Sequence, residues 1–110
     1  MEIEFIQPWR ELSAGTEATS LQRRLEFEVT PLHALWEKGI RVVGRNDAND
    51  DIVVAMSGGG FAIVHLVWGE SPGDALWPAS RRFSSADEIS QAMREWSREA
   101  GYLNEEWKLD

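Results

Sequence analysis

The sequence predicts an α+β fold: an antiparallel meander of three to four strands, with an N-terminal and a C-terminal helix packed on the sheet. Three short apolar segments follow one another at 40–44, 52–56 and 61–68. The separators between them, 46–51 and 57–60, are rich in turn-forming residues, which favours hairpins between neighbouring strands. Helical patterns stand before and after this block, an arrangement typical of the α+β class.

Composition bounds the class of protein. The 110 residues are 43% hydrophobic and 27% charged, which excludes a disordered chain and predicts a single domain over residues 1–110. Cysteine is absent, so disulfides, thiolate metal sites and a thiol nucleophile are excluded. The longest apolar stretch, 61–68, is far shorter than the ~20 residues that span a bilayer. The chain opens without a secretory signal pattern, and we expect a cytoplasmic protein.

Two elements are predicted before the sheet. Apolar and polar residues alternate over 1–6, which predicts a short edge strand that Pro8 ends. A loop at 13–16 is expected to supply the cap of a helix from about Glu17 to about Glu28. The apolar residues of this helix recur at helical spacing and share one face: Ala18, Leu21, Leu25 and Val29.

The strands follow a turn at 30–39. Three apolar residues of this turn are expected to point inward: Leu32, Leu35 and Trp36. The segment 61–68 is apolar on both faces, which predicts a central strand covered from both sides. The segment 79–83 is expected as a fourth strand at an edge, because Arg81 and Arg82 would face opposite ways.

The second helix is the clearest element. Ser85 and Glu88 form a capping box at its start, and Gly101 can take the left-handed conformation that ends a helix. One face carries the apolar residues: Ile89, Met93, Trp96 and Ala100. We expect Trp107 and Leu109 to pin the polar tail that follows.

The charge balance bears on partners. The chain has 11 basic and 19 acidic residues, for a net charge of −8, and a pI of about 4.7. This charge repels nucleic acid and anionic lipid, so we expect neither as a partner. It favours a basic protein partner, although solubility alone also explains an acidic surface.

Six tryptophans are many for this length: Trp9, Trp36, Trp68, Trp77, Trp96 and Trp107. For any one of them, packing in or near the core is the first expectation. The alternative is a binding face, where tryptophan is enriched.

Three patterns that could carry chemistry fail on their context. Residues 47–51 copy the first ligand positions of a calcium loop but lack its glycine and its closing glutamate. The glycines at 58–60 precede a strand, which favours a hairpin turn over a phosphate cradle. Ser57, His65 and Asp51 are the residue types of a hydrolase triad, but no nucleophile elbow surrounds the serine. We therefore predict no catalytic residue, no metal site and no cofactor.

Several short motifs lie within residues 30–85: Pro31-Leu32, Arg45 and Asp47, Asp50-Asp51 before Ile52-Val53, Val64-His65-Leu66-Val67-Trp68, Trp77-Pro78 and Phe83-Ser84-Ser85. With these motifs the middle of the chain resembles a type of small bacterial protein with no known activity. Threonine is expected in that type at the position of Val67. The resemblance implies a bacterial cytosolic domain and carries over no functional residues.

These observations predict a non-enzymatic protein-binding module, similar to an antitoxin or an immunity protein. We expect its contacts at Trp68, Glu70, Asp74 and Trp77, with His65 as a further candidate. The alternative is a small-molecule-binding domain or weakly specified enzyme with a pocket near His65. Without such a role, the His65 imidazole is expected to stay neutral and hydrogen-bonded inside or beside the core. A structural accessory protein is a third hypothesis, and we expect a monomer or a weak homodimer.

Overall fold

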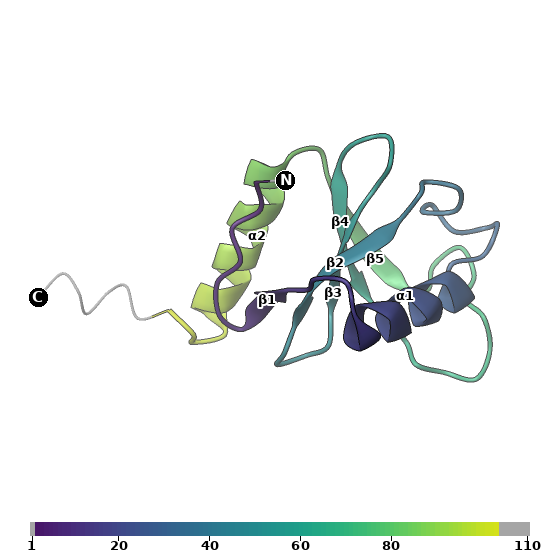
Figure 1. Cartoon of the computed structure of the whole chain (residues 1–110), viewed down its shortest axis with the longest axis horizontal. Coiled ribbons are helices and arrows are strands. Elements are labelled where there is room, and N and C mark those ends of the chain that lie inside the picture. The colour runs from purple at the N-terminus through teal and green to yellow at the C-terminus, as the bar shows by residue number, and fades with distance from the viewer. Residues whose placement is uncertain (1, 104–110) are drawn as a thin grey trace, which may run out of the picture.

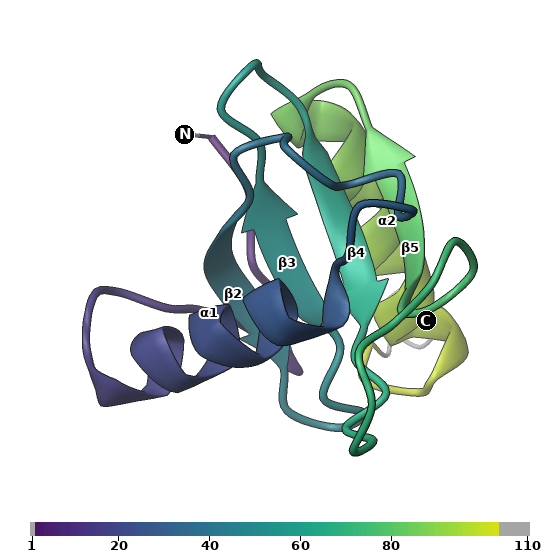
Figure 2. The same ribbon diagram turned by 90° about the vertical axis from the view of Figure 1, so that its right-hand side faces the viewer.

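A computed structural model describes residues 2–103 as a five-stranded antiparallel sheet between two helices. In chain order the elements are β1 (Trp9–Glu11), α1 (Thr16–Glu28), β2 (Arg41–Asn46), β3 (Ile52–Ala55), β4 (Phe61–His65), β5 (Ala79–Phe83) and α2 (Ala86–Glu99). The strands are neighbours in sequence order, β1-β2-β3-β4-β5, as a meander requires. The helices cover opposite faces of the sheet (Figures 1 and 2). The predicted class and meander are confirmed, with five strands in place of three to four.

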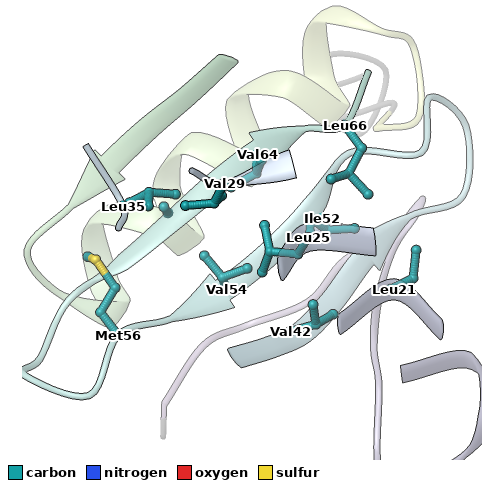
Figure 3. Close-up of a cluster of buried hydrophobic side chains, with 11 residues drawn as sticks. Leu21, Leu25, Val29, Leu35, Val42, Ile52, Val54, Met56, Val64 and Leu66 are labelled. Carbon is teal, nitrogen blue, oxygen red and sulfur yellow. The ribbon is translucent and has the colours of Figure 1, made fainter. Parts of the chain in front are cut away.

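Two apolar cores follow from this layering. Side chains of a strand alternate between its faces, so β3 and β4 supply both cores. The core beneath α1 is shown in Figure 3 and centres on Leu25, Ile52 and Val64, which are fully buried. The core beneath α2 contains Val53 and Met93, also fully buried. This double coverage explains the strands that are apolar on both faces.

The edge strand predicted at 1–6 is wrong. The first strand, β1, begins after Pro8, and residues 2–6 run alongside α2 (Figure 1). There the Glu4 backbone N–H donates to Ser90 Oγ at 2.9 Å, and Ile3 and Phe5 pack against the α2-side core. The alternation therefore reflects one half-buried side and not pairing with a strand.

The inner strands also differ from the prediction in detail. β4 ends at His65, three residues before the predicted end, and the middle place in the sheet belongs to β3. β5 lies at an edge, as predicted. The glycine turn before β4 is a hairpin turn with positive φ at Gly59 (100°) and Gly60 (89°), which glycine adopts without steric cost.

The predicted ends of the two helices can be compared with the caps that the structure shows. The capping residue of α2 is Ser85, whose Oγ accepts from the Glu88 N–H at 3.1 Å, and Gly101 has φ 90°. Helix α1 begins at Thr16, and its N-cap residue is Gly15, which lies in the loop expected to supply the cap but makes no side-chain cap bond. The prediction for Trp107 and Leu109 lies outside the described residues.

Within residues 2–103, neither helix combines the length and the apolar character needed to cross a membrane.

An ion-pair network joins β1, α1 and β2. Arg10 donates to both oxygens of Glu17, at 3.1 and 2.8 Å, and Arg45 donates to Glu17 at 2.9 Å. Arg10 also pairs with Asp47 at 2.9 Å. The hydrogen bond from Arg10, followed by that from Arg45, lowers the pKa of Glu17 from 4.5 to about 2. The bond from Arg10 likewise lowers the pKa of Asp47.

This network predicts acid sensitivity. A carboxyl group whose pKa is lower in the folded state stabilises the fold above its unfolded pKa and loses that contribution as the pH falls through the folded pKa. For Glu17 the loss runs from about pH 4.5 down to about pH 2. Urea unfolding at steps across this range should show a shallower decline for Glu17→Gln than for the wild type. Equal slopes in the two proteins would contradict the assignment.

Candidate protein-binding surface

Exposed apolar side chains gather in three segments of the described chain. Eight large hydrophobic residues are exposed. Seven of them lie at the end of α1, in the turn at 30–39 or in the loop at 66–78: Phe27, Leu32, Trp36, Val67, Trp68, Leu76 and Trp77. Leu32 and Leu76 are the most exposed of them, at 74% and 76%. The expectation that Leu32 and Trp36 point inward is wrong, because both are exposed. Large exposed apolar patches are typical of interaction sites.

Hydrogen bonds hold these three segments together. The Gly73 N–H donates to the backbone oxygen of Glu28, the last residue of α1, at 3.0 Å. Thr30 Oγ1 donates to the Gly73 oxygen at 3.1 Å. The loop at 66–78 thus curls around the C-terminal end of α1 (Figure 1). We call the residues Phe27, Leu32, Val67, Trp68, Leu76 and Trp77 the apolar surface.

Glu28 is the buried anchor of this surface. Its residue is 1% exposed, and its carboxylate accepts from the backbone N–H groups of Val67 at 2.8 Å and Trp68 at 2.9 Å. Arg24 Nε donates to the same carboxylate at 2.6 Å. These bonds explain why β4 stops early, because the amides that would continue the strand turn to Glu28 instead.

Trp68 adopts a backbone conformation that favours glycine. Its φ is 63°, and a non-glycine residue in this region costs about 1–3 kcal/mol, which the surroundings must offset. Such strain concentrates at functional sites. The bond from the Trp68 N–H to Glu28 fixes the residue, and its side chain is 53% exposed.

Arg24 forms part of the same surface. Its guanidinium carbon lies 4.9 Å from the centre of the Phe27 ring and 5.4 Å from that of Trp68, within the range of cation–π attraction. Its Nη2 donates to the Gly69 oxygen at 2.6 Å. One guanidinium thus orders two exposed rings and the start of the loop.

His33 fastens the other end of the loop. It is 5% exposed, and its Nδ1 accepts from the Leu35 N–H at 3.0 Å. An accepting Nδ1 leaves the proton of a neutral imidazole on Nε2, which lies 2.7 Å from the Pro78 oxygen and donates to it. Both ring nitrogens of His33 thus hold the backbone of the turn and of the loop.

Asp74 orders the tip of the loop. Its Oδ1 accepts from the N–H groups of Leu76 at 2.9 Å and Trp77 at 3.0 Å, the local bonding that favours aspartate in turns. A hollow of about 370 Å³ opens beside this turn. Val67, Glu70, Pro72, Asp74 and Trp77 are among the residues that line it. Four of the predicted site residues, Trp68, Glu70, Asp74 and Trp77, therefore lie on one ordered loop.

The charged residues within the segments 25–37 and 66–78 are all acidic. The segments 25–37 and 66–78 carry five carboxylates and no lysine or arginine. The carboxylates belong to Glu26, Glu28, Glu37, Glu70 and Asp74. Arg24 neutralises Glu28, while Glu26, Glu37, Glu70 and Asp74 are exposed. A partner that covers this surface meets a negative rim.

His65 lies apart from these residues. It stands on the α2 side of β4, with its side chain 59% exposed and Nδ1 2.6 Å from Asp51 Oδ1. His65 was expected inside or beside the core, but its side chain is exposed. The expected hydrogen bond is present and joins His65 to Asp51. Ser57 lies beyond the opposite end of β3, where its Oγ donates to the Lys38 oxygen, so the three triad-type residues do not meet. Among residues 2–103, no three His, Asp or Glu side chains group as a metal site needs.

Only Trp9 of the five described tryptophans is buried, and Trp96 is partly buried. Trp36, Trp68 and Trp77 are exposed, so core packing is the wrong expectation for these three. Trp107 lies outside the described residues.

Sequence reasoning missed Glu28 and Arg24. The signal for Glu28 was present, because it follows Leu21 by seven residues and so falls on the apolar face of α1.

Comparison with models of known families, with curated proteins and with solved structures finds no match.

Proposed function

We propose that this protein is a non-enzymatic binding module of the bacterial cytoplasm that holds a basic protein partner on its apolar surface, as an antitoxin or immunity protein does. The observation that carries the proposal is the exposed apolar surface fixed by the buried Glu28. The bonds from Glu28 and the contact with Arg24 hold the exposed Trp68 in a fixed position, so a partner meets a preorganised surface. Aromatic residues on rigid backbone are typical anchors of protein interfaces.

Charge selects the partner. The apolar surface carries a negative rim, and the whole chain has a net charge of −8. Complementary charge speeds association and excludes wrong partners. A protein that presents lysine or arginine around an apolar centre fits both properties of this surface.

The test compares affinity capture by two tagged forms of the full chain from a lysate of its host. The variant Leu32→Ser/Leu76→Ser removes the two most exposed side chains of the surface, which costs the fold little because both are already in water. Tyr102→Ser is the control, since among residues 2–103 Tyr102 is the exposed large hydrophobic residue that lies outside the three segments.

The proposal predicts a basic partner in equal molar amount, whose recovery falls as salt rises and drops about tenfold in Leu32→Ser/Leu76→Ser. Tyr102→Ser should retain it. A partner that both variants capture equally would overturn the assignment of the surface. No stoichiometric partner at low or high salt would overturn the function and favour the small-molecule alternative near His65.

A further inference from the structure

The hollow beside Asp74 combines an apolar wall with unneutralised carboxylates. Val67, Pro72 and Trp77 supply apolar surface, and Glu70 and Asp74 supply charge. Within the described residues Glu70 makes no hydrogen bond or ion pair, and Asp74 uses Oδ1 for the turn at Leu76 and Trp77. The hollow therefore offers negative charge next to an aromatic side chain that is 51% exposed.

The chain itself shows how this part of the surface binds a guanidinium. Arg24 lies against the Phe27 and Trp68 rings while its nitrogens donate to the Glu28 carboxylate and the Gly69 oxygen. An aromatic face, a carboxylate and a backbone carbonyl together complete its contacts. The hollow presents two of these chemical groups, the Trp77 ring and the Asp74 carboxylate, a few residues farther along the loop.

We propose that this hollow receives an arginine side chain of the protein partner. The guanidinium group stacks on Trp77 and pairs with Asp74 and Glu70, and the methylene stem lies along Val67 and Pro72. Arginine fits better than lysine because its planar group can stack on a ring and donate to a carboxylate at the same time. The inference rests on the proposed function and names the partner group that this site recognises.

The experiment titrates the full chain, labelled with ¹⁵N, with N-acetyl-arginine amide and follows the amide and indole N–H signals. The neutral isostere N-acetyl-citrulline amide is the matched probe. The proposal predicts saturable shifts at the Trp77 indole and at amides of 67–77 with the arginine probe alone, at millimolar concentrations. Equal shifts with the citrulline probe, or shifts centred on α2, would overturn it.

A pair of variants isolates the two carboxylates. Glu70→Gln/Asp74→Asn removes both charges while the asparagine oxygen can still accept the two N–H bonds of the turn. It should weaken binding of the arginine probe about three- to tenfold, the range expected for two surface ion pairs. Asp87→Asn/Glu95→Gln changes the net charge equally on α2, where both residues are exposed, and should leave probe binding unchanged. Equal weakening by both variants would show a general charge effect and overturn the site.

The two proposals fail separately. If Leu32→Ser/Leu76→Ser releases the captured partner while Glu70→Gln/Asp74→Asn retains it fully, the arginine site is wrong and the binding surface stands. If Leu32→Ser/Leu76→Ser retains the partner, the proposed surface is wrong. Loss of the partner in both variants, with arginine-specific shifts at Trp77, supports both proposals.

Discussion

Replacing Glu28 with alanine is expected to lower the free energy of unfolding by about 3–5 kcal/mol, the usual cost of breaking a buried ion pair. The change strands three donors at once: the Val67 and Trp68 N–H groups and the Arg24 guanidinium. Urea unfolding measures the loss. The amide signals of the 66–78 loop should shift or broaden as well, because the loop loses its anchor on α1.

Glu26→Ala is the matched control for this prediction. Glu26 lies on the same helix, is exposed and accepts from the Gln22 side chain, so its loss should change stability by no more than about 0.5 kcal/mol. Glu28→Gln should fall between the two, since the amide keeps one accepting oxygen. If Glu28→Ala cost no more than Glu26→Ala, Glu28 would not anchor the loop.

Replacing Gly73 with alanine is expected to cost about 1–3 kcal/mol, as overpacking of a tight contact does. A β-carbon there would collide with the backbone oxygens of Trp77 and Glu28. The Glu28 oxygen accepts from the Gly73 N–H and the Trp77 oxygen accepts from the Asp74 N–H, so moving either oxygen opens a hydrogen bond of the loop. The variant should therefore be less stable by urea unfolding and should show altered amide signals across the loop.

Gly58→Ala provides the comparison for Gly73→Ala. No atom lies within 4 Å of a β-carbon at Gly58, so this variant should match the wild type or gain up to about 1 kcal/mol from reduced chain entropy. Equal stability of the two alanine variants would mean that the loop does not sit tightly against α1.

Elements with local signals were predictable from the sequence. Helix α2 follows from Ser85 and its spacing to Glu88, and the turn before β4 follows from its glycines. These interactions join residues close in sequence, so the pattern contains both partners. The position of β5 at an edge was also predictable, because the neighbouring residues Arg81 and Arg82 face opposite sides of the strand and both need solvent.

The errors arise where distant residues decide the structure. An apolar run continues past His65, yet the Val67 and Trp68 amides bond to Glu28, about 40 residues earlier. The alternation at Ile3 and Phe5 reflects contact with the α2-side core. Neither sequence pattern contains its partner, so both segments were predicted as strand.

The candidate site was predictable in part for the same reason. Its loop stands out because tryptophans and carboxylates alternate with turn formers at 68–77. Phe27 and Leu32 were missed because their exposure depends on how α1, the turn and the loop meet. The sequence pattern predicts the apolar and acidic character of the loop. Tertiary contacts determine which residues of α1 and of the turn lie beside the loop on the apolar surface.

Hydrogen exchange of the protein alone and in its captured complex locates the partner on the fold. We expect added protection at backbone amides of 66–77 and of the turn at 30–36, with little change in α2 and β5. Protection confined to α2, to the β5 edge or to the surroundings of His65 would show that the partner does not bind the apolar surface.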